Sequence, residues 1–157
     1  MQQASDRVVL HVEDSDDDAE LVARALNTAN VPTAMVRVRD GAEALDYLFA
    51  RRGYAGRDTS DQPVLVLLDW QLPGLSGLDV LKTIRAHERT RELPVVVFSS
   101  TECEHDHASA SRLLANCIVR KPHAYDEFAA AARAICLMWL SYNRTPVSRV
   151  ARPCSPT

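Results

Sequence analysis

The chain has 157 residues, of which 46% are hydrophobic and 25% are charged, and these values fit one globular domain that buries its own core. Its formal net charge of −3 argues against binding to nucleic acid or to a membrane surface through general basic charge. No apolar run approaches the roughly 18 residues of a membrane span, and the first residues lack a basic segment with an apolar core behind it. We therefore expect a cytoplasmic protein whose partner is another protein, with neither nucleic acid nor a membrane as partner.

The first predicted element is a short strand over residues 8–12, an apolar run that ends in the carboxylates of Glu13 and Asp14. His11 lies inside this run, and we expect it to be a packed, hydrogen-bonded core side chain rather than a metal ligand. A helix follows that begins with three aspartates at residues 16–18. Acidic residues in a first helical turn complement the helix dipole, so these three need no other function. Glu13 and Asp14 precede the helix and have no such explanation.

The next part of the chain predicts the edge and the centre of a sheet. Residues 34–39 alternate between apolar and charged side chains, which is typical of an edge strand with one wetter face. A helix with one apolar stripe is predicted over residues 42–52, and an exposed loop over residues 53–62. Residues 64–68 are all aliphatic, which predicts a strand buried on both faces, and Asp69 follows it directly. Ligands of open α/β sheets bind beyond the carboxyl ends of the strands, so Asp69 is a candidate for chemistry.

The remaining chain repeats the alternation of strand and helix. Strands are predicted over residues 93–98 and 117–119, and helices over residues 78–89, 102–115 and 128–139. A Pro-Gly turn separates Asp69 from the first of these helices. The hydroxyl of Ser99 stands at the end of one strand, and Lys121, followed by Pro122, at the end of the other. The helix over 102–115 has few strongly apolar residues, and such weakly held elements are candidates for movement.

Strands that alternate with helices predict an α/β fold with a doubly wound parallel sheet, in which all strands end at one rim. That rim would bring together Glu13, Asp14, Asp69, Ser99 and Lys121. Three carboxylates repel one another unless a cation joins them, and hard oxygen ligands favour Mg²⁺ or Mn²⁺. Mg²⁺ is commonly completed by phosphate oxygens, and an aspartate can itself accept a phosphoryl group. The sequence therefore predicts phosphoryl transfer at this rim.

These motifs, in this order at strand ends, resemble the receiver domain of two-component response regulators from residue 7 to residue 140. The resemblance implies five strands in the order 2-1-3-4-5 with five helices, and no output domain. Residues 141–157, with several Arg and Pro and no acid, are expected to form a disordered tail. The family also implies a protein that is not an enzyme in the usual sense, but takes part in its own phosphorylation and dephosphorylation.

The same resemblance implies a role for each motif residue. Asp69 is the phosphoacceptor, Ser99 is the hydroxyl that moves onto the phosphoryl group, and Lys121 pairs with that group. The implied Mg²⁺ ligands are Asp14, Asp69 and the backbone carbonyl of Gln71, with Glu13 acting through water. The family also implies a cis peptide bond before Pro122. Receivers usually carry an aromatic residue three positions before the lysine, whereas this chain has Ile118, which puts an aromatic switch in doubt.

A finer resemblance is to single-domain regulators that partner bacterial and cyanobacterial phytochrome kinases. It rests on the amino-acid sequences of residues 30–32, 38–48, 115–117 and 138–140 and on the long loop before Asp69. This group implies a histidine kinase as phosphodonor and a homodimer. Residues 135–140 are apolar all round, which agrees with a partner surface, although burial under the protein's own loops is the alternative.

Other readings stay open at this point. A phosphorylation-independent dimeric module that docks on a sensor kinase is one alternative, and an aspartyl phosphatase is another. The phosphatase would need an acid two residues after the nucleophile, where this chain has Gln71. Cys103, His105 and His107 could bind a transition metal, but a solvated helix start explains them more simply. The four cysteines have no paired spacing, so we expect free thiols.

Overall fold

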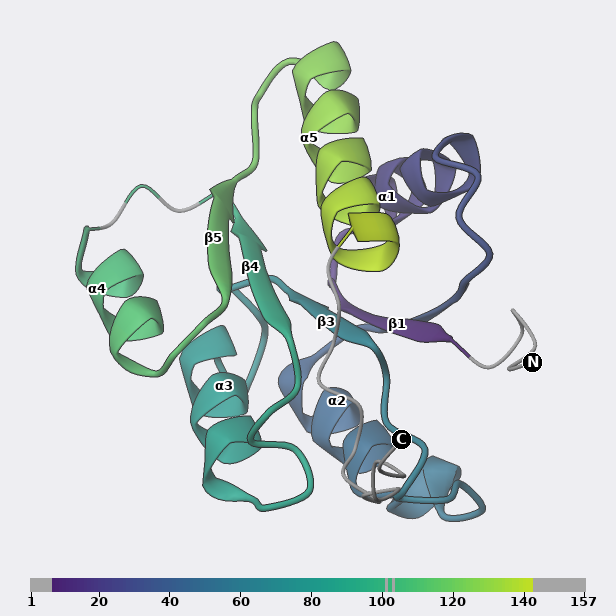
Figure 1. Cartoon of the computed structure of the whole chain (residues 1–157). Coiled ribbons are helices and arrows are strands. Elements are labelled where there is room, and N and C mark those ends of the chain that lie inside the picture. Colours follow the sequence, from purple (N-terminus) through teal and green to yellow (C-terminus); the bar gives the residue numbers. More distant parts are fainter. Residues whose placement is uncertain (1–6, 101, 103, 143–157) are drawn as a thin grey trace, which may run out of the picture.

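The computed structural model describes residues 7–100, 102 and 104–142. At its centre is one sheet of five parallel strands in the order β2-β1-β3-β4-β5, so the predicted fold class and strand order are confirmed (Figure 1). The strands are β1 (Val8–Val12), β2 (Ala34–Val38), β3 (Leu65–Leu68), β4 (Val95–Ser99) and β5 (Cys117–Arg120). β2 lies at one edge of the sheet, as its alternating pattern predicts.

Helices connect the strands and cover both faces of the sheet. They are α1 (Asp16–Thr28), α2 (Gly41–Leu48), α3 (Gly77–Ala86), α4 (Glu104–Arg112) and α5 (Tyr125–Leu137). A 3₁₀ turn (Arg52–Tyr54) follows α2, and a π-helical turn (Met138–Tyr142) extends α5. α1 and α5 pack together on one face, whereas α2, α3 and α4 lie toward the other (Figure 1). No helix of the described residues is long and apolar enough to cross a membrane.

The apolar runs are buried because helices cover both faces of this parallel sheet. All four residues of β3 and all five of β4 are buried. Alternate residues of one strand point to opposite faces, and accordingly Val66 packs with the α2–α3 side while Leu65 and Leu67 pack with the α1–α5 side. This two-sided burial fixes the register of the central strands, and the register fixes where each strand ends.

Helix ends are where the structure departs most from the expected boundaries. The helix expected over 42–52 ends at Leu48, because Ala50 and Arg52 have positive φ angles of 51° and 49°. The helix expected over 78–89 ends at Ala86, where the next residue has an extended backbone. α4 is shorter than expected, and among its described residues only Ala110 is buried. The sparse apolar contacts expected for this helix are therefore confirmed.

Most of the apolar side chains at the C-terminal end of α5 pack into the protein's own core. Ile135, Cys136 and Leu140 are buried, while Met138 is 57% exposed and Tyr142 is 76% exposed. Ser141 and Tyr142 belong to the π-helical turn, so the start of the expected disordered tail at residue 141 is wrong by two residues. The rest of that expectation, residues 143–157, lies outside the described residues.

Candidate functional site

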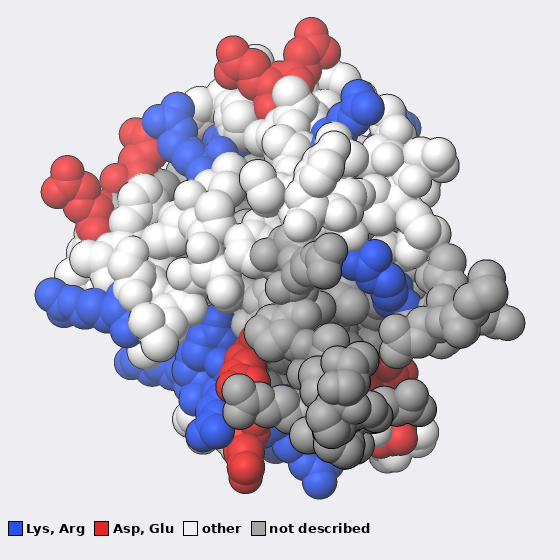
Figure 2. Space-filling view, in the orientation of Figure 1, with Lys and Arg blue, Asp and Glu red and all other residues white. Residues whose placement is uncertain are grey.

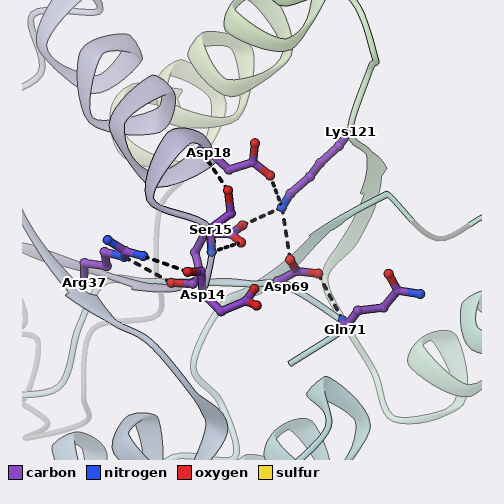
Figure 3. A network of polar contacts seen from close by, with 8 residues as sticks. Asp14, Ser15, Asp18, Arg37, Asp69, Gln71 and Lys121 are labelled. Atoms are coloured by element: carbon purple, nitrogen blue, oxygen red, sulfur yellow. Dashed lines mark hydrogen bonds and ion pairs between the residues drawn. The ribbon is translucent and has the colours of Figure 1, made fainter. Parts of the chain in front are cut away.

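Acidic side chains and one lysine gather at the carboxyl rim of the sheet, as the strand ends predict (Figure 3). The ammonium of Lys121, which directly follows β5, contacts Glu13 Oε2 at 2.5 Å and Asp69 Oδ2 at 3.1 Å. It also contacts Asp18 Oδ2, in the first turn of α1, at 2.9 Å. Four elements of the chain are thereby joined through one nitrogen atom.

Asp18 is a site residue that the sequence reasoning missed. The helix dipole was a sufficient reason for an acid at this position, so nothing in the pattern singled it out. The local structure explains its orientation. Ser15 caps α1 by accepting a hydrogen bond from the Asp18 N–H at 3.3 Å, and the Ser15 N–H donates to Glu13 Oε1 at 3.1 Å. This cap holds the first turn of the helix against the end of β1.

The loop after β3 orients Asp69. The backbone N–H of Gln71 donates to Asp69 Oδ1 at 3.0 Å, so both carboxylate oxygens of Asp69 accept a hydrogen bond (Figure 3). Gly74 has a φ of +73°, a conformation that glycine adopts without strain, and this confirms the predicted tight turn. Gly77 then begins α3, and its N–H donates to the carbonyl of Trp70 at 3.0 Å.

Burial sets the electrostatics of the rim. Glu13 is 1% exposed, and this burial raises its pKa to about 7, against the opposing effect of its hydrogen bond to Lys121. Burial alone would lower the pKa of Lys121, but Asp69, Asp18 and Glu13 together raise it above its ordinary value. Lys121 therefore stays protonated over the physiological range, and it is the fixed positive charge of the site.

The carboxylates of Glu13, Asp14 and Asp69 form the acidic cluster that the sequence predicts. One oxygen atom from each lies within 4.8 Å of the others. Glu13 and Asp69 are buried and Asp14 is exposed, so the cluster opens to solvent on the side of Asp14. Three convergent carboxylate oxygens with one open side are the donor set that a hard divalent cation prefers. These residues fit such an ion.

Ser99 ends β4 and is 3% exposed. Its carbonyl accepts a hydrogen bond from the Lys121 N–H at 2.9 Å, which links the ends of β4 and β5. Ser99 lines a small space together with Trp70, His107 of α4 and Ile118 of β5. Ile118, which stands where receivers usually have an aromatic residue, thus lines the same space as Ser99.

A cleft of about 320 Å³ opens beside Lys121. Asp18 and Leu21 of α1 line one side, and His123 and Phe128 line the other. The cleft therefore reaches the Asp18 and Lys121 side of the site, between α1 and the segment that joins β5 to α5.

Three expectations need correction or stay untested. The described residues contain no cis peptide bond, so the expected cis bond before Pro122 is wrong here. The trans isomer is the default for X–Pro bonds, and it already lets Lys121 reach Asp69.

His11 is buried as expected, but its Nδ1 has no hydrogen-bond partner among the described residues, and burial lowers its pKa to about 3. Cys103 lies outside the described residues, and no metal-binding group in the described chain includes His105 or His107.

Comparison with known proteins gives a consistent family. The model of the response regulator receiver domain matches residues 9–133. The probable methanogenesis regulatory protein FilR2 of Methanothrix harundinacea is 34% identical over 139 residues, which are 88% of this chain and 87% of FilR2. The response regulator Rcp1 of Synechocystis sp. is 30% identical over 142 residues, which are 90% of this chain and 95% of Rcp1.

Solved structures agree with these relatives. The Mn²⁺-bound form of Rcp1 superposes with a TM-score of 0.84 at 30% identity, over 89% of this chain and 99% of that one. The phosphorylated cyanobacterial phytochrome response regulator RcpA superposes with a TM-score of 0.83 at 34% identity, over 89% of this chain and 98% of that one. With its sheet order, its acidic rim and its lysine, the chain belongs to the response regulator receiver domain family.

Proposed function

We propose that this receiver accepts a phosphoryl group on Asp69 from a phosphohistidine of a sensor kinase and relays the signal through protein–protein contacts. The observation that carries the proposal is the convergence on Asp69, which touches Lys121 at 3.1 Å and lies within 4.8 Å of the Glu13 and Asp14 oxygens. An isolated structural aspartate would need neither the lysine nor the two other acids.

The chemistry follows from the groups around Asp69. A carboxylate oxygen of Asp69 attacks phosphorus, a P–O bond forms, and the P–N bond to the donor imidazole breaks with its electron pair left on nitrogen. The ammonium of Lys121 and the hydroxyl of Ser99 bind oxygens of the transferred group. In dephosphorylation, water attacks phosphorus, the P–O bond to Asp69 breaks, and inorganic phosphate leaves as the carboxylate is regenerated, so the protein takes part in both reactions.

The proposal includes a Mg²⁺ or Mn²⁺ ion at the acidic cluster. Asp14, Asp69 and the carbonyl of Gln71 would bind it directly, and Glu13 would act through water. When bound, such an ion neutralises negative charge on the carboxylates and on the transferred oxygens. The contact of the Gln71 N–H with Asp69 supports this set, because it keeps the backbone of residue 71 beside that carboxylate.

The likeness to the phytochrome response regulator RcpA supports a phytochrome-type histidine kinase as the partner. The cleft beside Lys121 supports approach of that partner between α1 and the end of β5. We also propose a homodimer, supported by the exposed side chains of Met138 and Tyr142 at the end of α5.

Phosphorylation of the wild type with Asp69→Asn as comparison tests the main proposal. With a small phosphodonor and Mg²⁺, intact-mass measurement should show one added phosphoryl group on the wild type and none on Asp69→Asn, because the amide is not a nucleophile for phosphorus. Asp61→Asn, an exposed aspartate away from the rim, is the matched control and should be phosphorylated like the wild type. Stoichiometric phosphate on Asp69→Asn, or none on folded wild type with either a small donor or kinases, would refute the assignment.

Removal of the metal gives a second test. An ion that binds only the folded state at 100 times its dissociation constant should add about 2.7 kcal/mol to the free energy of unfolding. MgCl₂ should therefore raise the urea midpoint of the wild type, and EDTA should reverse the increase. Asp14→Asn should abolish the response, whereas Asp17→Asn, also exposed and on the same segment, should keep it. Equal midpoints in MgCl₂ and EDTA for the wild type would contradict the metal site.

A further inference from the structure

A second cation, Arg37, lies on the opposite side of the acidic cluster from Lys121 (Figure 3). It comes from β2, the edge strand, where it is paired in register with His11 of β1. Its guanidinium donates from Nε to the carbonyl of Glu13 at 3.1 Å and from Nη2 to the carbonyl of Asp14 at 3.2 Å. The remaining Nη1 group binds Asp16 Oδ1 at 2.6 Å.

These contacts differ in kind from those of Lys121. Lys121 binds carboxylate oxygens, whereas Arg37 binds the backbone of the two residues that supply carboxylates to the cluster. In Figure 3 the backbone of Asp14 faces Arg37, and its side chain extends toward Asp69. The arginine therefore leaves the carboxylates free, and it fixes the segment from which they project.

Partial burial and the geometry of the guanidinium both restrain these contacts of Arg37. The Arg37 side chain is 23% exposed, and the rigid fork of a guanidinium fits several acceptors at once. The neighbouring backbone adds one more tie, because the Glu13 N–H donates to the carbonyl of Val38 at 3.0 Å. Without the arginine, the carbonyls of Glu13 and Asp14 would each lose one hydrogen-bond donor. The third contact, to Asp16, holds the guanidinium itself in place.

We infer that Arg37 is a positioning residue of the metal site, which holds the backbone of Glu13 and Asp14 so that their carboxylates face Asp69. The inference rests on the proposed function, since it concerns the affinity of the same acidic cluster for a divalent cation. Outer partners that orient metal ligands typically change metal affinity by about 10–100-fold when they are replaced. The effect of Arg37 is expected to fall in that range.

Charge and positioning predict opposite results, which makes the inference testable. A positive charge near the cluster repels a cation, so if Arg37 acted only by its charge, Arg37→Gln would bind Mg²⁺ more tightly and Arg37→Lys would bind it unchanged. If Arg37 acts by holding the backbone, both variants lose affinity, because lysine keeps the charge but cannot span the two carbonyls.

The matched control is Arg39→Gln. Arg39 directly follows β2 and also binds Asp16 Oδ1, at 2.9 Å, but its side chain is 63% exposed. Removal of Arg39 therefore alters the same surface charge without removing the contacts to Glu13 and Asp14. Asp16→Asn is a second variant: it weakens the anchor of Arg37 from an exposed position and leaves the core untouched.

The experiment is a titration with MgCl₂ followed by Trp fluorescence, with Trp70 beside Asp69 as reporter, and urea unfolding in EDTA as a separate measure of stability. Arg37→Gln and Arg37→Lys should bind Mg²⁺ about tenfold more weakly or worse, Asp16→Asn should be intermediate, and Arg39→Gln should stay within about twofold of the wild type. A role in stability alone would move the urea midpoint and leave Mg²⁺ affinity unchanged.

Two outcomes would overturn the inference, and they separate it from the proposed function. If the wild type binds Mg²⁺ and the two Arg37 variants bind it equally well or more tightly, the positioning role is wrong and the metal site stands. If the wild type itself binds no Mg²⁺, the metal site is wrong and the role of Arg37 falls with it.

Discussion

Replacing Lys121 by Met is expected to lower the free energy of unfolding by about 3–5 kcal/mol in EDTA, because it removes one partner of a buried ionic cluster and leaves the others uncompensated. The ammonium is shared by Glu13, Asp18 and Asp69. Glu13 and Asp69 are only 1% and 7% exposed, so water cannot replace it. Urea unfolding measures the loss.

The same variant should respond more strongly than the wild type to a divalent cation. MgCl₂ would bring positive charge to carboxylates that have lost their lysine, so part of the lost stability should return as the salt is added. Lys82→Met is the matched control, since Lys82 is the other lysine of the chain and is exposed on α3. It should stay within about 0.5 kcal/mol of the wild type. Equal midpoints for the two lysine variants in EDTA would contradict the ionic role of Lys121.

Gly77→Ala should be the most disruptive single-methyl change at the rim. A Cβ at this position would lie 2.6 Å from the carbonyl oxygen of Asp69 and 2.7 Å from the Cα of Trp70. Both are backbone atoms and cannot turn away, so the loop itself must shift. Overpacking of this kind typically costs about 1–3 kcal/mol, and the shift would also move the Asp69 carboxylate relative to its partners. We expect a lower urea midpoint together with weaker Mg²⁺ binding.

Gly53→Ala separates crowding from a general effect of losing glycine. Nothing lies within 4 Å of a Cβ built on Gly53, and this residue is in the short 3₁₀ turn far along the chain from Asp69. Its replacement should leave stability within about 0.5 kcal/mol of the wild type and leave Mg²⁺ binding unchanged. If Gly77→Ala matched this control in both measurements, close packing against Asp69 would not be the reason for glycine at position 77.

The sequence was sufficient for the sheet and for most of the rim because both depend on simple patterns. Unbroken aliphatic runs such as residues 65–68 can be buried on both sides only where helices cover both faces of the sheet. Polar residues that end such runs must then meet at one rim. The sequence alone could therefore place Asp69 and Lys121 at the same rim. The predicted helix ends agreed less well with the structure. The end of α2 at Leu48, for example, depends on the positive φ angles of single residues, which composition does not encode.

The missed residues were missed for a common reason. Asp18 and Arg37 each had a sufficient local explanation, one as a first-turn acid and the other as the polar side of an edge strand. Their contacts cross between elements: Asp18 reaches Lys121 over 103 positions of sequence, and Arg37 reaches Glu13 over 24. Side-chain reach of this kind depends on rotamers and on the packing of neighbours, which a pattern of residue types does not specify. His11 belongs to the same class, because its burial could be read from the strand, whereas the lack of a partner for its Nδ1 among the described residues could not.

The three contacts of Lys121 use the full donor capacity of an ammonium group, which has three N–H bonds. If Asp69 accepts a phosphoryl group as proposed, the new acceptor oxygens would meet a lysine that has no donor to spare, so one present contact would have to be exchanged. Asp18 is the partner that gives way at least cost, because its side chain is 31% exposed and water can solvate it, whereas Glu13 is sealed in the interior. Under the proposed phosphorylation, loss of the Asp18 contact would link the chemistry at the end of β3 to the first turn of α1, with Lys121 as the residue that exchanges partners.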